Sequence, residues 1–430
     1  PGMGIPGGFF PAAGKGVRDK CWAVACVIHG GTTPIALVGT DTLFIGRPTV
    51  EEARQAIHQQ TGIPTQNILI GASHTHTGGP VGPAHGSRGD PTYLARLAHG
   101  ITAAVVAAWH DRQPREIGIG IGREDRISFN RRFLMRDGRE ITHPGKPGTP
   151  HHDQIVRPAG PIDPDVGVLA ARDSKGNITG VVVNFACHNT VMGGNQFSAD
   201  YVGQLRKHLQ RHYGEHTPVV FLLGACGDIT QVDNLSRAHE FGPDYADMFG
   251  GKLAAETIRT IDRLTWWHAF PVAVATQTAV ISIRPEPDVD RERPAFGLGS
   301  GSSIEAVYEA GRKQVAELRR TTPRVPTEVQ AIRIGPLGIV TNGAEYFCDY
   351  ALRVKAASLF KPTWVVSLAN DALGYVPTPQ ALVAGGYEAR TTYWSRFAAD
   401  TGQLLLEAGL KALAKIAPDA GRKSTSAESP

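Results

Sequence analysis

Short apolar runs alternate with amphipathic segments along most of this 430-residue chain. The runs NILIGA (67–72) and PVVFLLG (218–224) have the length and composition of strands that are buried on both faces. Between them, 91–111 carries apolar residues at helical spacing. Buried strands that alternate with such helices predict an α/β fold, with a mixed β-sheet core flanked by helices. We expect one large layered domain over 1–416 and a polar, disordered tail at 417–430.

The same patterns predict five further segments. We expect a pocket to be shaped by two of them: the loop at 137–164, which includes the Pro- and His-containing stretch 143–158, and the Pro- and Gly-rich insertion at 284–303. The segments are a helix over 49–61 with Thr49 as its N-cap, a loop at 137–164, an insertion at 284–303, a helix over 344–358 and a final helix over 392–416.

Composition excludes several classes of function. A formal net charge of +4, without a block of basic residues, does not favour a nucleic-acid partner. No apolar run reaches the roughly 18–20 residues that a membrane span needs. The first residues lack a basic stretch followed by an apolar core, so no signal peptide is visible. The five cysteines include Cys187 and Cys226 in apolar runs, which favours free thiols and a cytoplasmic location.

Polar clusters follow three of the predicted strands. His74 and His76 lie in SHTHTG after NILIGA, His188 follows the run that ends at Cys187, and Asp228 closes GACGD after PVVFLLG. Ligands bind at the carboxyl ends of strands in open α/β sheets, so we expect the active site there. Two histidines at i and i+2 of an extended chain project to one face and could approach one metal ion. From the residues alone, a surface histidine pair, a core histidine and a turn-capping aspartate remain alternatives.

Glu345 and Tyr375 follow other predicted strands. Taken alone, a single glutamate or tyrosine is usually structural. Together with two histidines, however, the carboxylate of Glu345 completes a ligand set that suits zinc and leaves a position open for water. Imidazole and carboxylate ligands also suit manganese or iron.

In combination, these motifs resemble those of the neutral/alkaline non-lysosomal ceramidase family, amidases that hydrolyse N-acyl-sphingosine. The resemblance runs in order over roughly 15–415. It covers the family's N-terminal catalytic domain and not its C-terminal β-sandwich domain. The matching motifs are SHTHTG (73–78), NR (130–131), NFACH (184–188), SADY (198–201), GACGD (224–228) and YEA (387–389).

The resemblance implies a zinc-dependent amidohydrolase that uses a metal-activated water and binds one zinc ion per chain. The implied zinc ligands are His74, His188, Glu345 and Tyr375. The implied catalytic residues are His76, which passes a proton to the leaving amine, Arg131 and Tyr387, which donate to the developing oxyanion, and Asp228, which orients a ligand histidine.

Two departures from the family bear on the substrate. Thr230-Gln231-Val232 replaces the family's Ser-Pro-Asn, and Asn189 replaces a proline after the second metal histidine. We therefore predict cleavage of the C–N bond of a small or medium non-peptide amide other than ceramide. An esterase or lactonase with the same site and a catalytically silent metal-binding protein are the alternatives. The expected partner is the small-molecule amide, and a homo-oligomer is left open.

Overall fold

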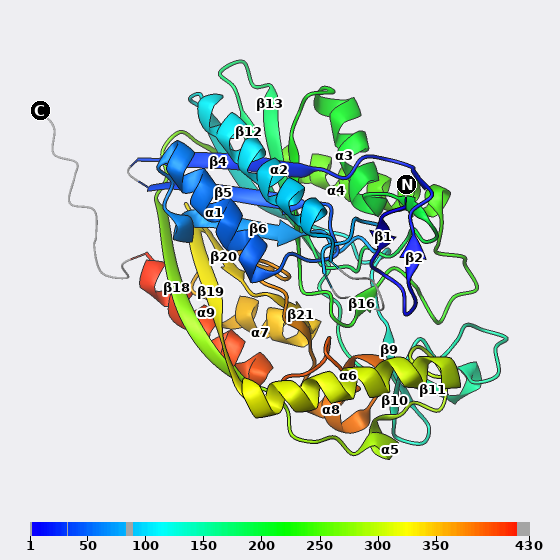
Figure 1. The fold of residues 1–430 in the computed structure, drawn as a ribbon. Helices are drawn as coiled ribbons and strands as arrows, with labels where there is room; N and C mark the ends of the chain where they lie inside the picture. Colours follow the sequence, from blue (N-terminus) through cyan, green and yellow to red (C-terminus); the bar gives the residue numbers. More distant parts are fainter. Residues whose placement is uncertain (1, 32, 83–88, 419–430) are drawn as a thin grey trace, which may run out of the picture.

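The computed structural model describes residues 2–31, 33–82 and 89–418 (Figure 1). Most of the predicted tail at 417–430 lies outside the described residues.

A five-stranded sheet occupies one side of the core. The strands β13 and β15 are parallel, and the other neighbours in this sheet are antiparallel. The helices α3 (Asp200–Tyr213) and α4 (Pro243–Ile261) pack against one another and cover one face of the sheet. In spatial order the strands are β15 (Val219–Leu223), β13 (Ile178–Phe185), β12 (Asp165–Arg172), β7 (Glu116–Arg123) and β17 (Trp266–Trp267).

Two smaller sheets complete the core. One contains β4 (Ala23–Gly30), β5 (Thr33–Thr40) and β6 (Ile68–Ala72), and Figure 1 shows α1 (Arg47–Thr61) and α2 (Pro91–His110) over it. Beside the other sheet, Figure 1 shows α9 (Thr401–Ile416), drawn in red. The strands of this sheet are, in order, β18 (Val272–Ser282), β19 (Arg324–Ile334), β20 (Leu337–Thr341) and β22 (Thr363–Val366).

The three sheets bury their inner faces against one another. Leu37, Leu169, Val182, Ile332 and Trp364, drawn from all three sheets, belong to one buried apolar cluster. Because side chains alternate along a strand, the neighbouring residues face the helices instead. The result is a layered α/β fold with helices outside and sheets inside. The predicted fold class is confirmed, although several sheets build the core in place of one.

The shorter elements connect these layers. None of the helices in the described part of the chain is both long and apolar enough to cross a membrane. The remaining helices are α5 (Val289–Glu292), α6 (Ser302–Thr321), α7 (Cys348–Ala357) and α8 (Pro379–Ala384). The remaining strands are β1 (Gly4–Ile5), β2 (Ala12–Ala13), β3 (Gly16–Val17), β8 (Phe129–Asn130), β9 (Arg132–Met135), β10 (Glu140–Thr142), β11 (Ile155–Pro158), β14 (Gln196–Phe197), β16 (Ile229–Thr230), β21 (Ala344–Tyr346) and β23 (Gly374–Val376).

Four predicted segments differ from the structure. The first helix begins at Arg47 with Gly46 as its N-cap, because Pro48 suits the first turn, so Thr49 is not the cap. The 137–164 loop contains β10 and β11, which flank β9 in a small sheet. The predicted 344–358 helix starts instead as the strand β21, and the last helix begins at Thr401.

Candidate metal centre

His74 follows β6 at a bend in the backbone. Its φ of 64° lies in the left-handed region, which costs a residue with a side chain about 1 kcal/mol or more and is concentrated at functional sites. The Nδ1 of the buried imidazole donates a hydrogen bond to the carbonyl oxygen of Leu43 at 2.7 Å. The prediction that His74 and His76 project to one face assumed an extended chain. The chain bends at His74 instead, and this bend directs the His74 ring.

The rings of His76 and His188 are held in the same way. The Nδ1 of His76 donates to the carbonyl of Gly7 at 2.9 Å, and that of His188 donates to the carbonyl of Cys226 at 2.6 Å. Because a carbonyl oxygen can only accept, each Nδ1 carries the proton and each Nε2 keeps its lone pair. Burial lowers the pKa of His188 to about 3 and that of His76 well below its ordinary value. Both rings are thus neutral, the form that binds a metal ion.

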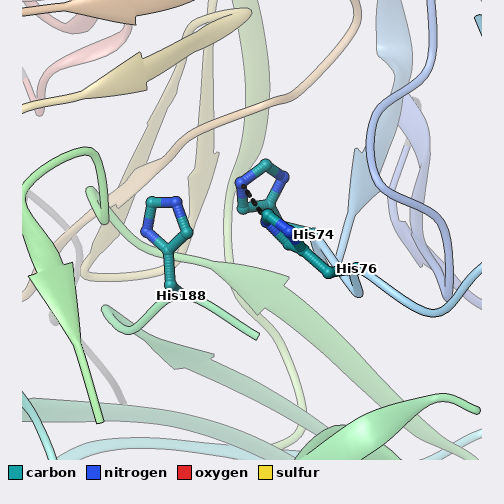
Figure 2. A group of neighbouring side chains, drawn as sticks. All are labelled: His74, His76 and His188. Atoms are coloured by element: carbon teal, nitrogen blue, oxygen red, sulfur yellow. Dashed lines mark hydrogen bonds between the residues drawn. The ribbon is translucent and has the colours of Figure 1, made fainter. Parts of the chain in front are cut away.

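The three imidazoles converge on one point (Figure 2). All of their ligand nitrogens lie within 4.8 Å of one another, and 3.4 Å separates the Nε2 atoms of His74 and His76. The structure therefore brings together three histidines that the sequence placed after two different strands. His76 lies within the cluster, so it is a candidate ligand as well as a candidate proton carrier.

Glu345 and Tyr375 reach the same point from a parallel pair of strands. In the register of β21 and β23, Glu345 lies opposite Tyr375. The Oε2 atom of Glu345 is 3.2 Å from Nε2 of His74 and 3.3 Å from Nε2 of His188. The Tyr375 hydroxyl is 3.4 Å from Nε2 of His188. All four predicted metal ligands and His76 thus surround one position.

These donor atoms fit a metal ion. With each Nδ1 protonated, the Nε2 lone pairs of His74 and His188 face the Oε2 of Glu345, a buried oxygen that has no hydrogen-bond donor among the described residues. Such an arrangement is repulsive unless a proton or a metal cation lies between the atoms, and the low pKa of His188 disfavours the proton. Ligands bound at 2.0–2.1 Å around a tetrahedral ion are about 3.3 Å apart, close to the separations found here.

Arg131 holds the Tyr375 hydroxyl through a hydrogen bond. Its Nη2 donates to the Tyr375 hydroxyl at 3.1 Å and to the Gly227 carbonyl at 2.8 Å, and its Nε donates to Glu388 at 2.7 Å. Glu388 is fully buried and also accepts a 2.7 Å bond from Arg132. Although burial opposes ionisation, the two guanidinium groups lower the pKa of Glu388 to about 2. Glu388 therefore stays charged and fixes Arg131; only its place in the YEA motif marked it in the sequence.

Asp228 and Tyr387 lie around this group. The Asp228 carboxylate accepts from the Asn130 side chain and the Cys348 backbone, both at 2.8 Å, and has no direct bond to the ring of His188. Asp228 thus holds the turn whose carbonyls orient His188, so its effect on the ring passes through the backbone. The ring of Tyr387 packs edge-on against that of Tyr375, with centroids 5.5 Å apart.

Comparisons with known proteins were made by sequence and by structure. No family model matches the sequence, and no curated protein matches it either. Among solved structures, a ceramidase complexed with C2 matches with a TM-score of 0.73 and 19% sequence identity. The chain has the fold of the neutral ceramidases. A neutral ceramidase from Pseudomonas aeruginosa also matches, with a TM-score of 0.71 and 19% identity. Each match covers 100% of this chain and 74% of the neighbour.

Proposed function

We propose that this protein is a zinc-dependent amidohydrolase that cleaves the C–N bond of a small or medium non-peptide amide. The observation that carries the proposal is the convergence of lone-pair-bearing Nε2 atoms on the orphaned Oε2 of Glu345. A purely structural zinc site has no need of a cavity, whereas catalytic zinc can take water or substrate as a further ligand. Here a cavity of about 920 Å³ opens beside His74, His76, Glu345 and Tyr375, which supports a catalytic site.

His74, His188, Glu345 and Tyr375 are the proposed zinc ligands. When bound, zinc supplies Lewis acidity toward an acyl oxygen and lowers the pKa of a coordinated water toward neutrality. The carbonyls of Leu43 and Cys226 orient the two ligand imidazoles, as outer partners of metal-bound histidines usually do.

The surrounding residues supply hydrogen bonds and a proton route. Arg131, held by Glu388, orients the Tyr375 hydroxyl, and Tyr387, whose ring packs against that of Tyr375, is the proposed donor to the oxyanion. His76 is neutral, and its Nε2 lies 3.4 Å from Nε2 of the ligand His74, so His76 is the proposed carrier of a proton to the leaving amine. Asp228 is the proposed positioning residue, because its hydrogen bonds hold the turn whose carbonyls orient His188.

Metal analysis tests the site. Purified protein should hold about one zinc per chain by elemental mass spectrometry, and His188→Ala should hold almost none. His268→Ala is the matched control, because His268 is an exposed surface histidine paired with Glu116. An unchanged zinc content in His188→Ala would refute the site. His76→Ala separates two roles, since it loses zinc if His76 is a ligand and keeps zinc but loses turnover if His76 carries the proton.

A substrate panel tests the chemistry. Zinc-loaded protein should hydrolyse acyl anilides, and the rate should fall by at least about 100-fold in His74→Ala. Faster turnover of matched p-nitrophenyl esters than of anilides would instead favour an esterase or lactonase. Bound zinc without turnover of any acyl substrate would indicate a catalytically silent metal-binding protein.

A further inference from the structure

The cavity beside the histidine cluster is mostly apolar. Its volume is about 920 Å³, and its polar end carries His74, Glu345 and Tyr375. An apolar wall of this kind suits a ligand with a hydrocarbon body, oriented by a few polar groups. The apolar lining includes Leu43, Phe44, Val81, Ile283, Leu318 and Val325.

Arg396 is a cation in this wall. Its largely buried guanidinium donates through Nη1 to the carbonyl of Tyr393 and lies 4.6 Å from the ring centroid of Phe397. No carboxylate in the described part of the chain forms an ion pair with Arg396. The acidic residue that acts on it through space, Asp371, is already bound by Arg47 at 3.0 Å. Burial lowers the pKa of Arg396 to about 10, and Asp371 opposes this shift only in part.

A second buried arginine shows what a structural role looks like in this protein. Burial also lowers the pKa of Arg284 to about 10. Its guanidinium, however, donates to the carbonyls of Ala389 and Phe397 and to the Ser395 hydroxyl. Arg284 therefore ties together the segment that carries Arg396. Arg396 itself lines the cavity with most of its donors unused by the described residues.

Arg396 and the metal centre share one wall of the cavity. The backbone N–H of Tyr375 donates to the carbonyl of Trp394 at 2.7 Å, and Trp394 also lines the cavity. Two residues of chain span at most about 7 Å, so the backbone of Arg396 lies close to that of Tyr375. Since Arg396 and Tyr375 also line the same cavity, a single small molecule can reach both the metal centre and the guanidinium.

We propose that Arg396 binds a carboxylate of the substrate, so that the amide cleaved at the metal centre is an amide of a carboxylic-acid-bearing molecule with an apolar body, such as an N-acyl amino acid. This inference rests on the proposed function. A guanidinium pairs with a carboxylate through two parallel hydrogen bonds, and a largely apolar cavity strengthens that pairing. A cavity that holds an otherwise uncompensated cation also rejects a neutral analogue, because the analogue leaves the cation unpaired.

Binding is measured first, on metal-free protein, so that it does not depend on turnover. Isothermal titration compares N-octanoylglycine with the neutral N-octanoylglycinamide. We expect the carboxylate to bind at least about 10-fold more tightly than the amide to the wild type, and about equally to Arg396→Met. The control is Lys313→Met, because Lys313 also lines the cavity but is exposed and already paired with Glu309 at 2.9 Å. That variant should keep the wild-type preference.

Turnover by the zinc-loaded protein is the second readout. The value of kcat/KM should be about 100-fold higher for N-octanoylglycine than for its neutral analogue, and Arg396→Met should abolish the ratio. The mono-N-butylamide of octanedioic acid carries its carboxylate on the acyl half. Its kcat/KM, compared with that of N-octanoylglycine, shows whether the substrate carboxylate lies on the acyl half or on the amine half of the amide.

Equal binding of the charged and neutral ligands to the wild type would overturn the proposal, as would a preference that survives in Arg396→Met. If Arg396→Met does not fold, Arg396→Lys should keep part of the preference, and an undiminished preference there would overturn the bidentate pairing. A carboxylate preference in binding without any turnover would leave Arg396 assigned while refuting the amidohydrolase.

Discussion

Gly227→Ala should loosen the metal centre through the backbone alone. A Cβ atom at Gly227 would lie 2.4 Å from the carbonyl oxygen of Glu345, whereas ordinary contacts begin at 3.4 Å. One of the two backbones must therefore move by about 1 Å. The Gly227 N–H donates to the backbone carbonyl of Tyr346, and the carbonyl of Gly227 accepts from Nη2 of Arg131, so the Gly227 backbone is held by two hydrogen bonds. We expect the strand β21 to move and to carry the Glu345 carboxylate away from the histidines.

The magnitude follows from two separate effects. Overpacking of this kind costs about 1–3 kcal/mol of stability. With about 2.1 cal/mol/K of unfolding entropy per residue, that loss lowers the Tm of a chain of this length by only about 1–3 °C. Displacement of one ligand should weaken zinc binding by about 10–100-fold, the range found when the supporting contacts of metal ligands are removed.

The assay measures both quantities. Zinc affinity is obtained by competition with a chromophoric chelator, and thermal unfolding is followed in excess chelator so that bound metal does not contribute. The control is Gly250→Ala, whose Cβ would lie 2.5 Å from the backbone nitrogen of Leu205 in the contact between α3 and α4. It should lose similar stability and keep its zinc affinity. Wild-type zinc affinity in Gly227→Ala, or an equal loss in Gly250→Ala, would refute the reasoning.

Three other perturbations test separate parts of the argument. Glu388→Ala leaves the buried guanidiniums of Arg131 and Arg132 without their carboxylate, and urea unfolding should show a loss of about 3–5 kcal/mol; a loss below about 1 kcal/mol would contradict the network. Burial raises the pKa of Asp200 from 3.8 to about 7, so between these pH values the folded protein binds a proton that the unfolded protein has released. The free energy of unfolding should therefore fall by at most about 4 kcal/mol as the pH rises from 4 to 7. In urea titrations at each pH, Asp200→Asn should remove this fall, and an unchanged dependence of stability on pH in the variant would contradict the reasoning. Removal of metal by a chelator should lower the Tm. Zinc at about 100 times its Kd should raise the free energy of unfolding by about 2.7 kcal/mol, and an identical Tm with and without zinc would argue against a zinc site in the folded state.

The ends of apolar strands identify part of the candidate site. His74 and His188 each follow a predicted strand, whereas the set of four ligands that includes Tyr375 is implied by the family resemblance, and the structure brings all four side chains together. The position of a strand end is encoded in local hydrophobicity, which a single sequence displays. The carbonyl partners of the imidazoles had no such signal, since every residue has a carbonyl and Leu43 could not be told from its neighbours.

The errors arose where local pattern and tertiary structure disagree. Residues 344–358 have helical spacing, but β21 extends because it pairs with β23, a partner that only the completed fold supplies. Residues 392–400 carry Trp394 and Phe397 at a spacing that imitates a helix. They form a turn that lines the cavity instead, held by Arg284 from a distant strand end.

The donors of the metal centre come from four stretches of chain that are remote in sequence: the bend at His74, the strand exit at His188, and the strands that carry Glu345 and Tyr375. No fragment that lacks one of these stretches can assemble the cluster, and a nascent chain cannot complete it until Tyr375 has left the ribosome. The proposed ion can therefore be bound only after these four stretches have come together. When bound, the proposed ion would cross-link the first and last thirds of the chain, so we expect metal-free protein to be cleaved faster by proteases than zinc-loaded protein.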